Sequence, residues 1–232
     1  SPEVREVSVA SDRALGKLIE AVERQVGPDG FVLVVTGDHG VAPIPEVNIQ
    51  RKMPGGRLTG NPVGKAVEAA LTRKYGDAKW IANSGETGFY LNLDAIDSRK
   101  IDRAEANRVA AEAALAVPHV FRVYTREQIL NGRLQDDSIG RRVSNGFFAQ
   151  RSPDVEFLLD PYWTAGNTPA SHSTPFGYDT HVPVVFLGAA IRPGHYDQPV
   201  TVNDVAPTLA TLLAVETPSG AVGRALAEIF VP

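Results

Sequence analysis

A short polar turn directly follows the first apolar run of the chain. Asp38 and His39 stand between Gly37 and Gly40, immediately after the apolar residues 31–35. Open α/β sheets bind ligands at the carboxyl ends of their strands, and the two glycines allow a turn sharp enough for both side chains to reach one ion. A carboxylate with a neutral imidazole suits zinc or manganese. The turn predicts a metal site; a strand-end turn with a solvated histidine is the alternative.

A second polar segment, residues 171–181, carries two histidines and leads into another apolar run, 182–187. His181 directly precedes that run, so it shares an edge with Asp38 only if the two runs are antiparallel. His172 has a longer tether and escapes this restriction. We therefore rank His172 first and His181 second as the third ligand, with Asp179 either orienting a ligand or replacing one. A solvated loop histidine is the alternative for each.

Other polar and aromatic residues are better explained by structure. His119 and His195 lie at a strand start and in a turn, and Tyr162-Trp163 is more typical of packing than of substrate stacking. The chain contains no G-x-S-x-G, no Walker loop and no G-x-G-x-x-G after a strand. Three candidate ligands are also about half of what a two-metal phosphoryl-transfer site requires.

The elements expected to position these residues alternate between helix and strand, which is typical of an α/β protein. Ser1 and Pro2 predict the start of a long amphipathic helix over 2–26. The runs 31–35 and 182–187 suit strands buried on both faces of a parallel sheet, and 155–159 looks like a further strand of that core. A last helix is expected over 203–213, where Asn203 and Asp204 form the cap.

The middle of the chain has a different pattern, typical of a small α+β insertion. We expect helices near 61–75 and 103–116, strands at 79–83, 88–93 and 119–124, and mostly helix over 126–146. The predicted domains are therefore an α/β core of 1–52 and 148–232 with an inserted subdomain at 53–147.

Composition excludes several classes of protein. Of 232 residues, 43% are hydrophobic and 22% charged, which is typical of a globular chain rather than a disordered one. The net charge of −4 argues against general nucleic-acid binding, and the lack of cysteine excludes thiolate metal sites and cysteine nucleophiles. No apolar stretch is long enough to cross a membrane. The start at Ser1, without methionine, fits a mature product, a domain or a fragment.

The motifs together resemble the alkaline phosphatase superfamily, in its branch of type I phosphodiesterases, nucleotide pyrophosphatases and phosphate-irrepressible alkaline phosphatases. Four stretches carry the resemblance in the family's order, and they span nearly the whole chain: 1–4, 34–41, 172–183 and 201–209. The third stretch resembles the family's late His-Gly…Tyr-Asp-Thr-His-x-Pro segment, although Ser173 stands where glycine is common. The resemblance implies a partial doubly wound alkaline-phosphatase-like sheet.

The resemblance also implies a site with two zinc ions. Asp38 and His39 would be ligands, one to each side of the site, and His172 would complete the other ion's shell. Phosphate esters would be the substrates, and the location would be periplasmic or secreted. The family's Thr or Ser nucleophile, its first metal-binding Asp and its Asp-x-x-x-His match no position here and would lie upstream of Ser1.

The sequence therefore predicts the C-terminal part of a zinc-dependent phosphomonoesterase or phosphodiesterase that is inactive alone. The alternatives are a non-catalytic fragment or binding module, and a sulfatase or phosphoglycerate mutase relative, against which the Tyr-Asp-Thr-His-x-Pro run argues. We also expect self-association through exposed core edges, or weak metal binding.

Overall fold

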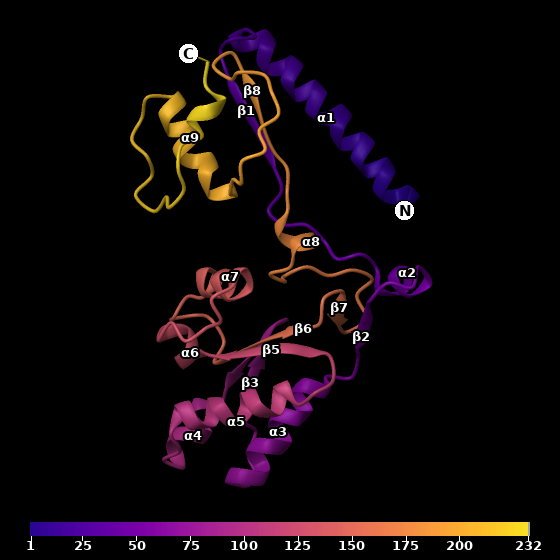
Figure 1. Cartoon of the computed structure of the whole chain (residues 1–232), viewed down its shortest axis with the longest axis vertical. Helices are drawn as coiled ribbons and strands as arrows, with labels where there is room; N and C mark the ends of the chain where they lie inside the picture. The colour runs from indigo at the N-terminus through magenta and orange to yellow at the C-terminus, as the bar shows by residue number, and fades with distance from the viewer. Residues whose placement is uncertain (232) are drawn as a thin grey trace. The chain divides into compact units, whose positions relative to one another are not determined.

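The computed structural model describes residues 1–231, which form two compact units (Figure 1). Unit 1 comprises Ser1–Asp38 and the segment from Val182 onward, and unit 2 comprises His39–His181. The chain thus leaves unit 1 directly after Asp38 and returns to it directly after His181. This partition does not test the expected insertion at 53–147, which stays a prediction.

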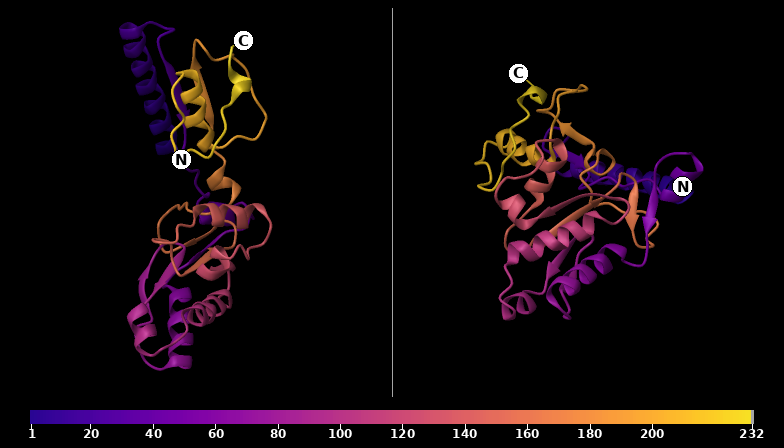
Figure 2. Two further views of the ribbon diagram at one scale, coloured as in Figure 1. Left: turned by 90° about the vertical axis from the view of Figure 1, so that its left-hand side faces the viewer. Right: turned by 60° about the horizontal axis from the view of Figure 1, so that its bottom comes forward.

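Unit 1 contains a long helix, a pair of strands and a C-terminal helix. Its elements are α1 (Pro2–Val26), β1 (Val32–Thr36), β8 (Val184–Gly188), the 3-10 turn η1 (Val202–Asp204), α9 (Val205–Leu212) and the 3-10 turn η2 (Ala227–Ile229). As predicted, the Ser1 side chain caps α1 by accepting from the Val4 N–H, and Gly27 ends the helix with a φ of 81°. Helices α1 and α9 flank the strand pair on opposite sides (Figures 1 and 2).

The two apolar runs of unit 1 do form strands, and they pair with each other in a direction that the sequence left open. Strand β1 pairs with β8 antiparallel, with Thr36 opposite Val184. Val185 and Leu187 on β8 are 53% and 46% exposed, so this strand is not buried on both faces within the described residues. An apolar run indicates that a strand will be covered, but it does not encode the direction of its neighbour. The sequence analysis allowed His181 to share an edge with Asp38 only if these two strands are antiparallel, and they are.

Unit 2 is built on a four-stranded antiparallel sheet in the order β3-β4-β6-β5. The strands are β3 (Ile81–Ser84), β4 (Gly88–Leu91), β5 (Val120–Thr125) and β6 (Val155–Leu159), and the helices around them are α3 (Pro62–Tyr75), α4 (Leu93–Ser98), α5 (Arg103–Leu115), α6 (Arg126–Leu130) and α7 (Ser138–Gly146). Along β6, Val155, Phe157 and Leu159 join the larger core under α3 and α5, while Leu158 packs with residues of α6 and α7. This alternation follows from the two-residue period of a strand.

One expectation for unit 2 differs from the structure: residues 155–159 were predicted as a strand of the α/β core with 31–35, but β6 pairs with β4 and β5. The segment 126–146, expected to be mostly helix, contains two helices, and the chain turns after α6 at Gly132, whose φ is 63°. Helix α4 is an element that the sequence did not indicate.

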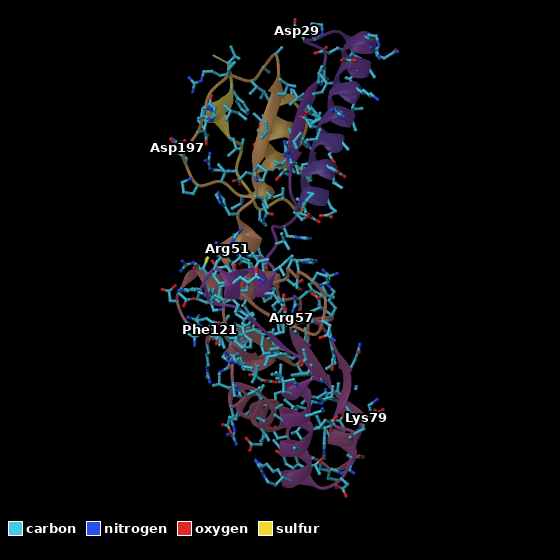
Figure 3. All side chains as sticks on the ribbon, turned by 90° about the vertical axis from the view of Figure 1, so that its right-hand side faces the viewer. Asp29, Arg51, Arg57, Lys79, Phe121 and Asp197 are labelled. Atoms are coloured by element: carbon cyan, nitrogen blue, oxygen red, sulfur yellow. The ribbon has the colours of Figure 1, made fainter. Side chains whose placement is uncertain are left out.

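A smaller parallel pair completes unit 2 and carries the loop toward His172. The two strands are β2 (Gly56–Leu58) and β7 (Trp163–Ala165), and the short helices nearby in the sequence are α2 (Pro45–Gln50) and α8 (Gly177–Thr180). Arg57 on β2, labelled in Figure 3, donates to both carboxylate oxygens of Glu46 at 2.6 and 2.9 Å and to the Pro169 carbonyl at 2.8 Å. It also donates to Thr164 Oγ1 and the Thr168 carbonyl, so one side chain fastens the 164–169 loop to β2. None of the helices described in residues 1–231 is long and apolar enough to cross a bilayer.

Candidate functional site

Two of the predicted ligand residues lie side by side in unit 2. The imidazole rings of His39 and His172 are stacked with centroids 3.7 Å apart and planes 14° from parallel. His39 opens unit 2 after the β1 turn, and His172 comes from the loop between β7 and α8. The fold thus brings together the two histidines that the sequence ranked highest.

The hydrogen bond of the His39 ring fixes its tautomer. Nδ1 lies 2.7 Å from the Gly40 carbonyl oxygen, which can only accept, so Nδ1 must carry the proton. A neutral ring with its proton on Nδ1 has its lone pair on Nε2. Metal-bound histidines characteristically donate their second N–H to a carbonyl or carboxylate in this way. The donor chemistry of His39 therefore fits zinc.

His172 is held by the residue that departs from the family pattern. Ser173 Oγ lies 3.1 Å from His172 Nδ1, which engages the same ring nitrogen as in His39. Ser173 has a φ of 76°, in the left-handed region that glycine adopts without strain. This backbone angle gives a physical reason for the glycine that the sequence comparison led us to expect at this position.

Asp179 connects the two loops of the site through hydrogen bonds. Its Oδ2 accepts from the Thr174 N–H at 2.8 Å and the Thr174 hydroxyl at 2.6 Å, while its backbone carbonyl accepts from the Gly40 N–H at 2.7 Å. Asp179 is buried, and its Oδ1 is buried without a hydrogen-bond partner among the described residues. Asp179 therefore contacts the His172 loop through its carboxylate and the His39 turn through its backbone carbonyl.

Gly40 belongs to the site, and the sequence did not reveal the main structural reason for a glycine at this position. A Cβ atom at this position would lie 2.1 Å from the Tyr178 carbonyl oxygen. The glycine is thus needed for close contact with α8 as well as for the turn that the sequence indicated. Nothing in the sequence pairs Gly40 with Tyr178, since the two become neighbours only in the folded unit.

The remaining candidates are placed as follows. Asp38 is the exposed last residue of unit 1 and directly precedes His39 in the sequence. His181 is the exposed residue that ends α8, where its N–H donates to the Gly177 carbonyl. Within residues 1–231 no three His, Cys, Asp or Glu side chains form a group that could hold a metal ion. Outside the site, His119 stacks on Trp163 with centroids 3.4 Å apart and bonds Asp160 at 3.1 Å.

These features define a mixed α/β protein with two imidazoles gathered at a glycine turn beyond a strand. The chain belongs to the type I phosphodiesterase / nucleotide pyrophosphatase family, whose sequence model matches residues 1–182. The family resemblance drawn from the four motifs is thereby confirmed.

Two relatives match nearly all of the chain. A Myroides odoratus protein named calcium-transporting ATPase is 25% identical over 231 residues, which are 98% of this chain and 42% of that protein. Alkaline phosphatase PafA of Elizabethkingia meningoseptica is 28% identical over 235 residues, which are 99% of this chain and 42% of that protein. Each name describes only the protein that bears it.

A solved structure confirms the fold class. The crystal structure of wild-type alkaline phosphatase PafA matches with a TM-score of 0.86 at 26% identity, over 95% of this chain and 42% of that chain. The predicted α/β, alkaline-phosphatase-like fold is therefore correct. The chain spans about 42% of the length of these relatives.

Proposed function

We propose that this chain supplies part of a two-zinc site in a phosphate-ester hydrolase. Asp38 and His39 would be ligands, one to each side of the site, and His172 would complete the other ion's shell, with Asp179 orienting the loop and His181 the alternative ligand. The observation that carries the proposal is the His39–His172 stack with the His39 tautomer set by the Gly40 carbonyl. The stack brings two imidazoles side by side, which supports their use as neighbouring ligands of one site.

The chemistry follows from the types of donor. Zinc ions bound there would neutralise charge on a transferred phosphoryl group and lower the pKa of an attacking hydroxyl. This chain's own part is to present two oriented imidazoles and a carboxylate. The Asp179 hydrogen bonds to Thr174 and to Gly40 keep both loops in register, so little reorganisation is needed when a ligand binds.

We propose further that the 232 residues alone do not catalyse hydrolysis. The motifs for the nucleophile, for phosphate-contacting side chains and for the other ligands match no position in this sequence. The substrate class proposed for the whole protein is phosphate monoesters or diesters, and its proposed location is the periplasm or the cell exterior. We propose no nucleic-acid partner.

The test compares the chain with the whole protein that contains it. Both are assayed for zinc-dependent release of 4-nitrophenol from 4-nitrophenyl phosphate and from its bis ester, with methyl and aryl sulfates as the sulfatase control. We expect activity in the whole protein and none above buffer from the chain. His39→Ala and His172→Ala in the whole protein should each lower kcat/KM by about a hundredfold or more. The control His195→Ala, at a turn of unit 1, should leave it unchanged.

Zinc binding gives a second readout. Titration calorimetry of the chain should show weak binding that His39→Ala or His172→Ala abolishes and His195→Ala leaves intact. Full activity of the whole protein with His172→Ala, or hydrolysis of sulfate esters in place of phosphate esters, would contradict the proposed function.

A further inference from the structure

A cavity in unit 2 begins beside the candidate site. It has a volume of about 140 Å³, and His172, Ser171 and Thr174 contribute its wall on the side of the stacked imidazoles. The opposite walls come from β6 and β7, with Phe157, Leu158, Leu159 and Trp163. All of its lining residues belong to unit 2.

The aromatic walls of this cavity are held rigidly. Trp163 carries the His119 ring stacked at 3.4 Å, and His119 is in turn bonded to Asp160. The Tyr178 hydroxyl accepts from the Tyr162 N–H at 3.2 Å, and its ring packs against those of Tyr162 and Phe176. Burial raises the pKa of Tyr178, so its phenol is neutral at physiological pH. Trp163 and Tyr178, fixed by these contacts, thus line the cavity together with Phe157, two leucines and two alanines, while the other lining residues are polar.

The dimensions of the cavity select the size of its ligand. An apolar cavity of about 150 Å³ is large enough to bind benzene. A space of about 140 Å³ fits one six-membered ring and is too small for a purine nucleoside. Glu86 on the β3–β4 hairpin is the charged carboxylate among the lining residues, and it disfavours a second anionic group on the ring.

We propose that this cavity is a subsite for the organic part of the ester, and that it takes a single uncharged aromatic ring. The ester phosphate would then lie toward His172, at the end of the cavity that adjoins the metal ligands. The phosphate end of this assignment rests on the proposed function. The ring end rests only on the lining of unit 2, so it can be tested without zinc or catalysis.

The binding test uses phenol and the tryptophan emission of the 232-residue chain. Of its two tryptophans, Trp80 is fully buried in the core and Trp163 lines the cavity. Measurements in the Trp80→Phe background therefore report Trp163. We expect a saturable change in emission with a dissociation constant on the order of 1 mM, as befits a ligand of so few atoms. The anion 4-hydroxybenzoate should bind about threefold more weakly because of Glu86.

A matched pair of variants tests the location. Thr168 lines the cavity and is exposed at its rim, whereas the preceding exposed residue, Asn167, does not line it. Thr168→Phe should abolish the saturable response, and Asn167→Phe should retain it. Because both residues are exposed, both variants should fold, which circular dichroism and the denaturation midpoint verify. A linear, non-saturating response, or an equal response in both variants, would overturn the subsite.

Kinetics of the whole protein connect the subsite with turnover. Thr168→Phe should lower kcat/KM for phenyl phosphate about tenfold and leave that for methyl phosphate unchanged. Equal losses for both esters would overturn the assignment of the cavity to the leaving group. If phenol binds to the chain as expected but the whole protein hydrolyses neither ester, the proposed function fails while the ring site stands.

Discussion

Gly40 shows how one missing side chain permits the contact between the His39 turn and α8. A Cβ atom there would meet the Tyr178 carbonyl at 2.1 Å, so the backbone would have to move apart. We expect Gly40→Ala to destabilise the chain by about 2 kcal/mol and to weaken zinc binding, since the turn carries His39. Urea unfolding and titration calorimetry measure the two effects. The control is Gly177→Ala, where nothing lies within 4 Å of the added Cβ. Equal stability of both variants would contradict this account.

At Ser173, in contrast to Gly40, we expect glycine to be more stable than a residue with a Cβ atom. At a φ of 76° a residue with a Cβ is strained, and glycine is not. Ser173→Gly should therefore be about 1 kcal/mol more stable than Ser173→Ala, since both variants lose the hydroxyl bonded to His172 and only one keeps the Cβ. Denaturation midpoints of the two variants decide the matter, and a more stable alanine variant would refute the assigned strain.

At this scale the sequence identified the residue types but not their partners. Asp38 and His39 were selected from their chemistry and the glycines on either side of them, and His172 from its chemistry and its place in a long polar loop. The stacking of His39 on His172 and the bond from Thr174 to Asp179 depend on a loop path that no local pattern encodes. The left-handed Ser173 shows the limit most clearly, because serine itself carries no signal for that backbone angle.

Among the elements, the fastening of β2 to the 164–169 loop depends on an ion pair that responds to pH. The Arg57 side chain hydrogen-bonds Glu46 and lowers the pKa of that carboxyl to about 2 from its ordinary 4.5. The folded chain thus keeps Glu46 ionised at a pH where the unfolded chain is protonated. The contribution to stability is complete above about pH 4.5 and is lost as the pH falls toward 2.

The expected result is a stability difference between the wild type and Glu46→Gln that stays constant from pH 7 to 5 and shrinks below about pH 4.5. Urea unfolding at several pH values measures it, and added salt should reduce it because Glu46 is exposed. A difference that stays constant down to pH 3, or that grows in acid, would show that the pair does not act in this way.

The elements themselves were predicted more accurately than their pairing. Helices α1, α3 and α5 were expected close to their observed bounds because their caps are local: Ser1, Asn61 and Asp102 each accept from a backbone N–H of the first turn. Strand partners are set by distant residues. Strand β6 was therefore recognised as a strand from its own residues, yet assigned to the wrong sheet.

For the molecule as a whole, unit 1 leaves much apolar surface uncovered. Helix α1 contains no buried residue, and its Val7 and Leu18 are 65% and 53% exposed. A two-stranded ribbon such as β1–β8 is at best marginally stable by itself. The chain spans about 42% of the length of its relatives. Sequence that the relatives have in addition would be able to cover such a surface. In the chain alone, burial of the same groups favours association between copies.

We therefore expect the 232-residue chain to self-associate, with a light-scattering mass that rises with concentration. The double variant Val7→Lys and Leu18→Lys should shift the mass toward that of the monomer, because charges on α1 oppose its burial in an interface. Val222→Lys is the control: that valine is 83% exposed on the C-terminal segment, outside α1 and the strand pair. A monomeric wild type at all concentrations would contradict the prediction, and so would equal effects of the α1 and Val222 variants.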